Sequence, residues 1–236
     1  MNMPEARYAI YFTPPERSEL ECICSTVLGR CARTGTVLKQ PTIPGIEPTR
    51  LTELTASPRH YGLHATLKPP FFLTDTHDET GLLESAAMIA SKIQSFDLPG
   101  LELARIGSFL ALTLTGPCPE LEDLARICVT VSDPFRRPPP PEELARRRAR
   151  GLTLNQERLL DLWGYPFVLE EMRFHLTLTG SIPDPEERER LRAALTPLLA
   201  PVLRTPIPVR DIYVFRQTCL EEPFTVHKRI TLAQKP

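Results

Sequence analysis

The sequence has little glycine and no long apolar segment, and each shortage excludes a class of architecture. Glycine accounts for 11 of the 236 residues, which excludes a collagen-like repeat and long glycine-rich linkers. No run of 18 apolar residues occurs, so no membrane-spanning helix is predicted. The first residues lack a basic segment followed by an apolar one, so no signal peptide is predicted. We therefore expect a cytoplasmic globular protein with no membrane partner.

A surplus of positive charge and a metal-binding cysteine pattern are also missing. Lysine and arginine total 28 against 29 acidic residues, a formal net charge of −1, whereas proteins that coat nucleic acid or anionic membranes carry a large positive surplus. The six cysteines show no repeated Cys-x-x-Cys pattern and no nearby histidine at zinc-ligand spacing. We expect free thiols, no metal and no cofactor, and the sequence gives no strong indication of a protein partner.

Proline is abundant instead, with 26 residues, roughly double the usual share of about 5%. This excludes a long coiled coil and divides the chain into short elements. Runs of β-branched and aromatic residues predict strands, and helical spacing of apolar residues predicts helices. The predicted strands are 7–12, 63–67, two strands joined by a Gly-Ser turn within 101–116, 173–180, 209–215 and 224–232. The predicted helices are 16–33, 78–96, 119–131 and 184–200, with an irregular loop over 34–58.

The second half of the sequence echoes the first, which predicts an α+β fold of two related lobes. RYAIYF (7–12) resembles RDIYVF (210–215), and each half contains one His-x-Thr-Leu motif. Each lobe should be a small, mainly antiparallel sheet with helices on its outer face, and the two lobes should enclose a central cleft. The predicted parts of this single domain (1–236) are a lobe of residues 1–132, a proline-rich connector of residues 133–141 and a lobe of residues 142–236.

The two motifs, which begin at His64 and His175, are the strongest functional feature of the sequence. Chance alone gives on the order of 0.07 matches to His-x-Thr-Leu in a chain of this composition. Side chains alternate between the two faces of a strand, and Pro69 and Pro70 are predicted to end the first strand. The polar faces are therefore predicted to carry the two sets His64, Thr66, Lys68 and Arg173, His175, Thr177.

If the two strands face one another, these groups converge on a point that suits a phosphodiester. Threonine hydroxyls can donate hydrogen bonds to the phosphate oxygens, and Lys68 and Arg173 can offset the phosphate charge. One histidine can act as a general base and the other as a general acid. Lys68 could instead be a charge at a strand end, and Arg173 could pair with a nearby glutamate. The sequence does not decide which histidine is the base.

Paired motifs of this kind resemble the 2H phosphoesterase superfamily, which includes the LigT-like RNA 2′,3′-cyclic phosphodiesterases. Longer segments are similar to a branch of uncharacterised proteins from bacterial phosphonate-utilisation operons: PRHYGLHATLKPPF (58–71), LARRRARGLT (144–153) and RLLDLWGYPFVLEEMRFHLTLTGSI (158–182). That branch tends to have Trp-Leu-Gly-Arg-Asp where this chain has VLGRC (27–31). This chain therefore lacks both the aromatic and the acidic residue of that pattern.

The resemblance implies that His64 and His175 are catalytic and that Thr66 and Thr177 bind phosphate. The expected activity is hydrolysis of a small cyclic phosphate, such as a 2′,3′-cyclic nucleotide or a ribosyl cyclic phosphate, or of an RNA 2′,3′-cyclic phosphate end. Tyr61 and Tyr165 could stack on a base or sugar, or pack in the core. A binding protein without turnover and an RNA ligase remain alternatives.

The arginine-rich segment 136–150 is the remaining feature without an assigned role. Six arginines stand against Glu142 and Glu143 in this segment, a local surplus of positive charge. A solvated helix face and a lip that faces phosphate or RNA are both consistent with this pattern. The sequence does not separate them, and it gives no oligomeric state.

Overall fold

Strand β1 (Arg7–Phe12) shows how the sequence determines the architecture of the computed structural model, which describes residues 5–234. Ile10 and Phe12 on one face of the strand join the main hydrophobic core, and Ala9 and Tyr11 on the other face join a second, smaller cluster. This alternation with a period of two is that of a strand buried on both sides. β1 consequently lies inside a sheet rather than at its edge.

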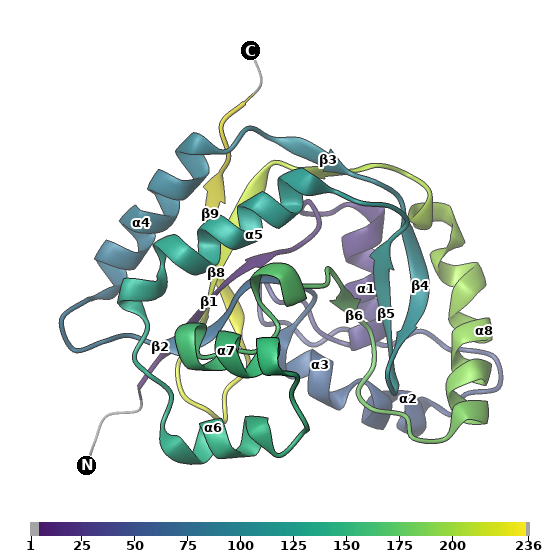
Figure 1. The fold of residues 1–236 in the computed structure, drawn as a ribbon. Helices are drawn as coiled ribbons and strands as arrows, with labels where there is room; N and C mark the ends of the chain where they lie inside the picture. Colours follow the sequence, from purple (N-terminus) through teal and green to yellow (C-terminus); the bar gives the residue numbers. More distant parts are fainter. Residues whose placement is uncertain (1–4, 235–236) are drawn as a thin grey trace.

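Three antiparallel sheets organise the chain (Figure 1). A four-stranded sheet has the order β2-β1-β8-β9, a three-stranded sheet the order β4-β5-β6, and β3 pairs with β7. The remaining strands are β2 (Ala65–Phe72), β3 (Phe96–Leu98), β4 (Leu101–Ile106), β5 (Phe109–Leu114), β6 (Leu176–Thr177), β7 (Ile207–Val209), β8 (Asp211–Gln217) and β9 (Thr225–Thr231).

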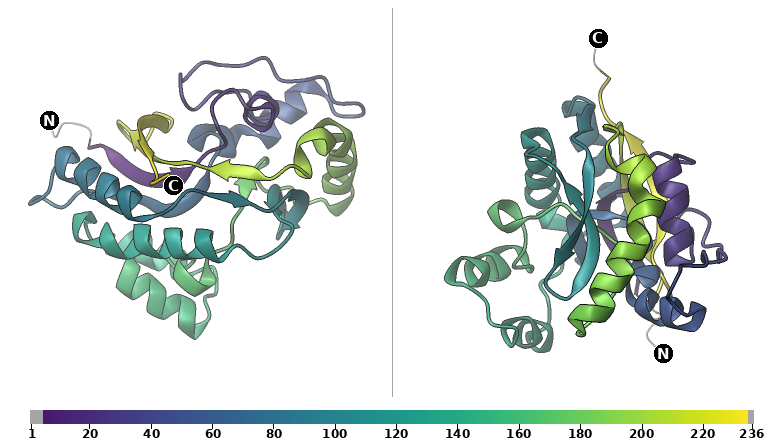
Figure 2. Two further views of the ribbon diagram at one scale, coloured as in Figure 1. Left: turned by 90° about the horizontal axis from the view of Figure 1, so that it is seen from above. Right: turned by 90° about the vertical axis from the view of Figure 1, so that its right-hand side faces the viewer.

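Helices cover the sheets on their outer sides (Figure 2). α4 and α5 pack against the four-stranded sheet, α8 packs against β4 and β5, and α1 packs against α8. In residues 5–234 no helix has both the length and the apolar character needed to cross a membrane. The helices are α1 (Glu19–Leu28), α2 (Pro48–Leu54), α3 (Ala56–Tyr61), α4 (Glu79–Lys92), α5 (Pro119–Val131), α6 (Pro141–Arg148), α7 (Leu154–Trp163) and α8 (Pro185–Leu203), with 3₁₀ turns η1 (Asp133–Phe135) and η2 (Leu169–Glu171).

The two lobes are formed in space, but neither is a contiguous half of the sequence. The four-stranded sheet joins β1 and β2 to β8 and β9, and the three-stranded sheet joins β4 and β5 to β6. The predicted α+β class with small antiparallel sheets is confirmed. The predicted lobes 1–132 and 142–236 do not each contain their own sheet, because strands from both sides of the connector 133–141 are paired in each.

β2 continues through Pro69 and Pro70, so the prediction that these prolines end the strand is wrong. β2 lies at the edge of its sheet, where a residue without an N–H can be accommodated. Its pairing with β1 also shifts register twice, between Tyr8 and Ile10 and between Ile10 and Tyr11. The strand therefore bends within the segment that carries the first motif.

Three other predictions of local structure need correction. The segment 34–58, predicted to be an irregular loop, contains α2 and the start of α3. The helix predicted over 16–33 is confined to α1, because Ser18 caps its first turn and Gly29, with φ +79°, ends it. The strand predicted over 173–180 is reduced to the two residues of β6.

Gly62 links α3 to the first motif, and its backbone requires glycine. Its φ and ψ of 76° and 176° lie in a region that is essentially restricted to glycine. A Cβ at this position would lie 2.4 Å from the Cβ of Ala32. The turn therefore packs its backbone directly on Ala32.

We predict that Gly62→Ala lowers the free energy of unfolding by about 3 kcal/mol or more, because backbone strain and overlap add. Gly45→Ala is the matched control: its φ is +76° and its added Cβ would meet nothing within 4 Å, so about 1 kcal/mol is expected. Urea unfolding at constant pH measures both. Ala32→Gly should cost less in the Gly62→Ala background than in the natural chain; equal costs would contradict the overlap.

Candidate active site

The two motifs lie on the edge strands of the two larger sheets. His64 immediately precedes β2 and His175 immediately precedes β6. Each of these strands has a neighbour on one side only. One cavity of about 490 Å³ is lined by both histidines and by Thr66 and Thr177. The predicted meeting of the two motifs across a cleft is therefore found in the fold.

The apolar residues of the motifs explain why the polar ones face the cavity. Ala65 and Leu67 in the first motif and Leu176 and Leu178 in the second are 0–2% exposed and belong to the main core. Since side chains alternate along a strand, burial of these residues turns the intervening threonines to the opposite side. Both threonines are partly exposed, and no hydrogen bond among residues 5–234 engages their hydroxyls.

The two imidazoles are held in the same way. The Nδ1 atom of His64 lies 2.8 Å from the carbonyl oxygen of Gly62, and the Nδ1 atom of His175 lies 2.7 Å from the carbonyl oxygen of Arg173. A carbonyl oxygen can only accept, so Nδ1 of each ring carries a proton and donates it. Nε2 is then the nitrogen that remains for chemistry in each neutral ring.

The two histidines differ in their surroundings. The ring of His64 stacks on Tyr11 with centroids 4.0 Å apart and planes at 24°, whereas His175 has Phe109 at 5.9 Å and a tilt of 54°. Burial lowers the pKa of His64, the hydrogen bond to Gly62 opposes this and the nearby His175 adds to it, with a net pKa of about 4. His64 is consequently neutral at pH 7, with a free lone pair on Nε2.

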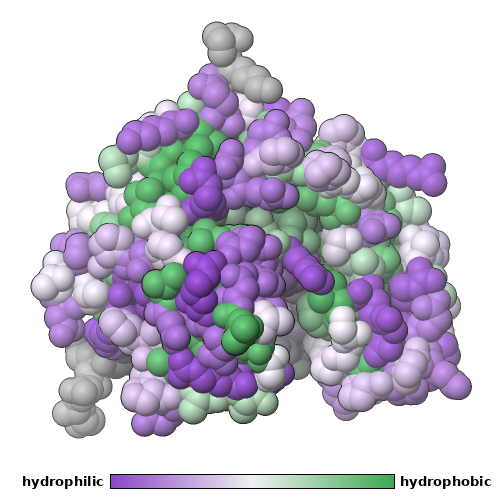
Figure 3. Space-filling view, in the orientation of Figure 1, coloured by the Kyte–Doolittle hydropathy of each residue, from purple (hydrophilic) through white to green (hydrophobic). Residues whose placement is uncertain are grey.

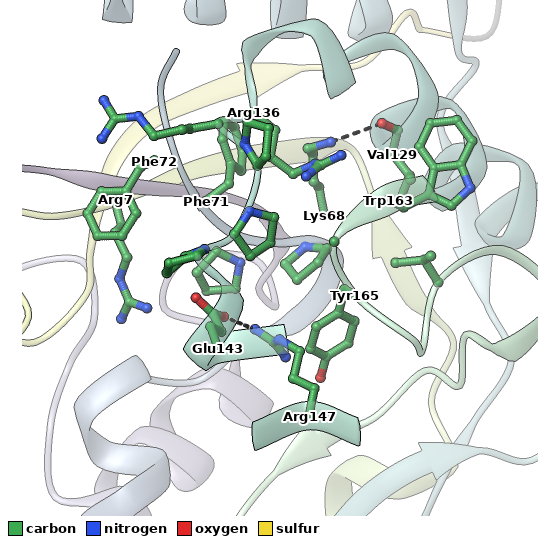
Figure 4. Close-up of a pocket in the computed structure, with 18 of the residues that line it drawn as sticks. Arg7, Lys68, Phe71, Phe72, Val129, Arg136, Glu143, Arg147, Trp163 and Tyr165 are labelled. Atoms are coloured by element: carbon green, nitrogen blue, oxygen red, sulfur yellow. Dashed lines mark hydrogen bonds and ion pairs between the residues drawn. The ribbon is translucent and has the colours of Figure 1, made fainter. Parts of the chain in front are cut away.

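Lys68 does not line the cavity of the two histidines. Its side chain is 2% exposed, and its amine donates to the carbonyl of Val129 at 3.0 Å and to Asp133 at 3.3 Å. It lines a neighbouring cavity of about 270 Å³ (Figure 4), where burial lowers its pKa to about 8. The predicted face shared by His64, Thr66 and Lys68 is interrupted, because the register with β1 shifts between Thr66 and Lys68.

Arg173 is also absent from the residues that line the cavity. Its side chain is exposed, and its carbonyl oxygen is the group that contacts His175. The strand that was predicted to place Arg173 beside His175 begins only at Leu176. Its backbone thus orients the histidine, while its guanidinium lies elsewhere.

Both predicted tyrosines line the cavity. Tyr61 stacks on Phe224 with centroids 5.4 Å apart. Tyr165 lies under the guanidinium of Arg147, at 4.8 Å from its Cζ, and burial raises its pKa. Each tyrosine therefore packs through its ring and also remains at the wall of the cavity. Packing and a position from which to contact a ligand, the two alternatives drawn from the sequence, thus occur together.

Sequence reasoning missed Arg7, which lines both cavities. Its Nε donates to Gln217 at 2.7 Å, and the amide nitrogen of Gln217 lies 2.8 Å from Nε2 of His60. Gln217 is fully buried, so this network fixes the direction of the arginine. Strand alternation in RYAIYF places Arg7 on the same face as Ala9 and Tyr11, and this pattern could have pointed to Arg7.

The arginine-rich segment divides into two sets. Arg136, Arg137 and Arg148 form ion pairs with acidic residues, chiefly Asp133, Glu5 and the pair Glu157 and Asp161. Arg146, Arg147 and Arg150 line the cavity with the histidines. The surface over α6 and α7 is largely hydrophilic (Figure 3). A solvated face and a lip of the cavity are therefore both present.

Acidic residues are few near the histidines. The one carboxylate that lines the cavity within residues 5–234 is Glu143, which pairs with Arg147. In the same part of the chain, no three His, Cys, Asp or Glu side chains come together as a group that could hold a metal ion. The site thus offers imidazoles, hydroxyls and guanidiniums as its chemical groups.

Comparison with known proteins places the chain in a family. Residues 66–225 match the family described as Protein of unknown function (DUF1045), so the chain belongs to that family. Escherichia coli LigT complexed with ATP is similar over 99% of this chain and 100% of its own, with a TM-score of 0.45 and 12% identity.

Two curated relatives bear the same name, Ribose 1,5-bisphosphate phosphokinase PhnN. The protein from Janthinobacterium sp. (strain Marseille) is 37% identical over 227 residues, which cover 95% of this chain and 50% of the relative. The protein from Laribacter hongkongensis (strain HLHK9) is 30% identical over 178 residues, 75% of this chain and 41% of the relative. The chain spans about half the length of the curated relatives it matches or less.

We predict that His64 titrates near pH 4 in an NMR titration, because burial disfavours its charged form. His175→Gln should raise this midpoint, because it removes the neighbouring charge. The folded-state pKa lies below the unfolded value of about 6.5. The neutral His64 therefore contributes stability that is lost as the pH falls from about 6.5 to about 4.

His64→Gln identifies the resonance and should also remove this pH-dependent loss from urea unfolding curves measured at pH 7 and pH 5. His77→Gln is the control, because His77 is exposed and does not line the cavity. A His64 midpoint between pH 6 and 7 would contradict the proposed burial of its ring.

Proposed function

We propose that this protein is a phosphodiesterase that hydrolyses a cyclic phosphate by general acid–base catalysis with His64 and His175. The observation that carries the proposal is the matched pair of imidazoles in one cavity, each with Nδ1 bound to a carbonyl. Two threonine hydroxyls without protein partners line the same cavity. This set supplies a base, an acid and donors to a phosphate.

The difference between the histidines supports a proposal for their roles. His64 is neutral at pH 7, so its Nε2 takes a proton from the attacking water. The water oxygen forms a bond to phosphorus while one ring ester bond breaks. Protonated His175 gives its Nε2 proton to the departing oxygen, which leaves a hydroxyl and a phosphomonoester. Thr66 and Thr177 donate hydrogen bonds to the non-bridging oxygens, where negative charge increases in the transition state.

The substrate class that we propose is a cyclic phosphate on ribose, as a 2′,3′-cyclic nucleotide or a ribosyl cyclic phosphate. The cavity of about 490 Å³ has the size of a small-molecule site. The curated relatives are named for a phosphorylated ribose, which supports a sugar phosphate and a role in phosphonate metabolism. A phosphokinase activity is not proposed for this chain, because the sequence has no Gly-Lys pair and thus no phosphate-binding loop of the P-loop type.

We predict that the purified protein opens a ribose 2′,3′- or 1,2-cyclic phosphate in the presence of EDTA. His64→Ala and His175→Ala should each lower kcat by about 10²- to 10⁴-fold, because each removes a proton-transfer group. Phosphomonoester product is measured by ³¹P NMR. Thr66→Val and Thr177→Val should each cost a smaller factor, about 10- to 100-fold, since one donor is lost.

Thr113→Val and His77→Ala are the controls, because Thr113 is also partly buried on a strand and neither residue lines the cavity. Turnover that disappears with EDTA and returns with added metal would overturn the metal-free mechanism. Tight binding of a cyclic phosphate with no product after long incubation would favour a binding protein. Ligation of RNA ends by the same histidines would favour a ligase.

We predict that the acidic limb of the pH profile of kcat/KM lies near pH 4, because this limb reports protonation of the general base, His64, in the free enzyme. A base with an ordinary histidine pKa of about 6.5 would already be mostly protonated at pH 5. Rates are measured from pH 3.5 to 8 with a saturable substrate. If the limb lies between pH 6 and 7, His64 is not the base.

A further inference from the structure

The cavity that contains the histidines has more positive charge than one cyclic phosphate can balance. Its lining includes four guanidiniums, from Arg7, Arg146, Arg147 and Arg150, and the carboxylate of Glu143. A cyclic phosphodiester carries a single negative charge. Even without the proton that His175 carries in the proposed mechanism, binding such a group alone would leave about two positive charges without a counter-ion in the site.

Three of these arginines form no ion pair with any acidic residue that the structure describes. Arg147 pairs with Glu143, whereas no ion pair between residues 5 and 234 involves Arg7, Arg146 or Arg150. Other arginines of the same region do find carboxylates: Arg148 contacts both Glu157 and Asp161. In the segment 136–150, the arginines that lie outside the cavity are thus neutralised, whereas Arg146 and Arg150, which line it, are not.

Helix α6 explains this separation. Residues 143, 146, 147 and 150 follow the spacing of one face of a helix, and all four line the cavity. Arg148 lies off that face and contacts acidic residues of α7. From β1, the hydrogen bond of Arg7 to Gln217 orients a fourth guanidinium of the cavity. Arg7 and Arg147 also line the adjoining cavity, where Figure 4 shows them.

Three tyrosine hydroxyls complete the wall. Tyr11, Tyr61 and Tyr165 all line the cavity, and no hydrogen bond among residues 5–234 engages their hydroxyl groups. Phenolic hydroxyls donate to phosphate and sugar oxygens. The cavity thus offers a second group of donors and cations in addition to the histidines and threonines.

From this charge distribution we infer that the substrate is a sugar cyclic phosphate that bears a second phosphate, a phosphomonoester. The inference rests on the proposed function. A phosphomonoester carries about −1.5 to −2 charges at pH 7, so together with the cyclic phosphate it balances the surplus. Arginine is well suited to it, because its planar guanidinium can donate two parallel hydrogen bonds to phosphate. Arg146 binds this group from α6, Arg150 from the turn that follows α6, and Arg7 from β1.

A small molecule fits these observations better than an RNA end. An RNA strand would continue out of the cavity and require unpaired cations along its path. Beyond the cavity, Arg136, Arg137 and Arg148 are paired with carboxylates, and the whole chain has a net charge of −1. Within the segment 136–150, the arginines without an ion pair among residues 5–234 are two that line the cavity, Arg146 and Arg150, as a compact bisphosphorylated ligand requires.

The test compares two substrates that differ only in the second phosphate: adenosine 2′,3′-cyclic phosphate and the same compound phosphorylated on the 5′ oxygen. We expect kcat/KM for the phosphorylated compound to be about 10²-fold higher, because charge-assisted hydrogen bonds form to the added group. In the double variant Arg146→Ala, Arg150→Ala the ratio should fall toward one. Arg148→Ala, a change on the same helix outside the cavity, should keep the ratio.

A binding measurement makes this test independent of turnover. Isothermal titration with adenosine 3′-phosphate and adenosine 3′,5′-bisphosphate should show tighter binding of the bisphosphate, and the double variant should lose the difference. If both cyclic compounds are hydrolysed with a ratio near one, the second-phosphate site is refuted and the proposed function stands. If neither is hydrolysed yet the bisphosphate binds more tightly, the proposed function fails and the anion site stands. A cyclic-phosphate-ended oligonucleotide that outperforms both compounds would overturn the inference in favour of RNA.

Discussion

The site depends on one interaction that occurs twice, the hydrogen bond from a histidine Nδ1 to the carbonyl two residues before it. In both motifs this bond is 2.7–2.8 Å long, and it selects the tautomer that leaves Nε2 available. The carbonyls are supplied by segments that are not strand, one of them a turn fixed by Gly62. The threonines are positioned differently, by burial of the apolar residues between them. Backbone geometry thus orients the two imidazoles, and core packing orients the threonine hydroxyls.

The sequence predicted the centre of the site well, because strand alternation over short distances is a local property. His64, Thr66, His175 and Thr177 reach one cavity, as their shared pattern implied. The prediction failed for Lys68, where a register shift against β1 breaks the alternation. It also failed for Arg173, because the backbone leaves strand geometry before reaching that residue. The spacing of residues in the sequence reveals neither the register shift nor the point where the strand begins.

Residues from distant elements were the hardest to predict. Arg7 belongs to β1, and its role in the cavity depends on pairing with β2 and on Gln217 from β8. In the segment around α6, the sequence does not show which arginines are paired with carboxylates. Only the ion pairs in the structure separate the neutralised arginines from the unpaired ones. Within α6 the helical period gives the relevant face, but the position of that face relative to the histidines is a property of the tertiary fold. The class and most of the strands were therefore predictable, whereas the order of strands across the two halves was not.

The interleaving of strands has a consequence for how the chain folds during synthesis. β1 lies between β2 and β8, and the side chain of Arg7 bonds to Gln217, 210 residues away. A nascent chain therefore exposes one long edge of β1 until nearly all of the sequence has left the ribosome. Pairing over such separations closes large loops and slows folding. The central strand of the sheet is thus the one that waits longest for its second neighbour, and it is the segment for which protection from aggregation matters most.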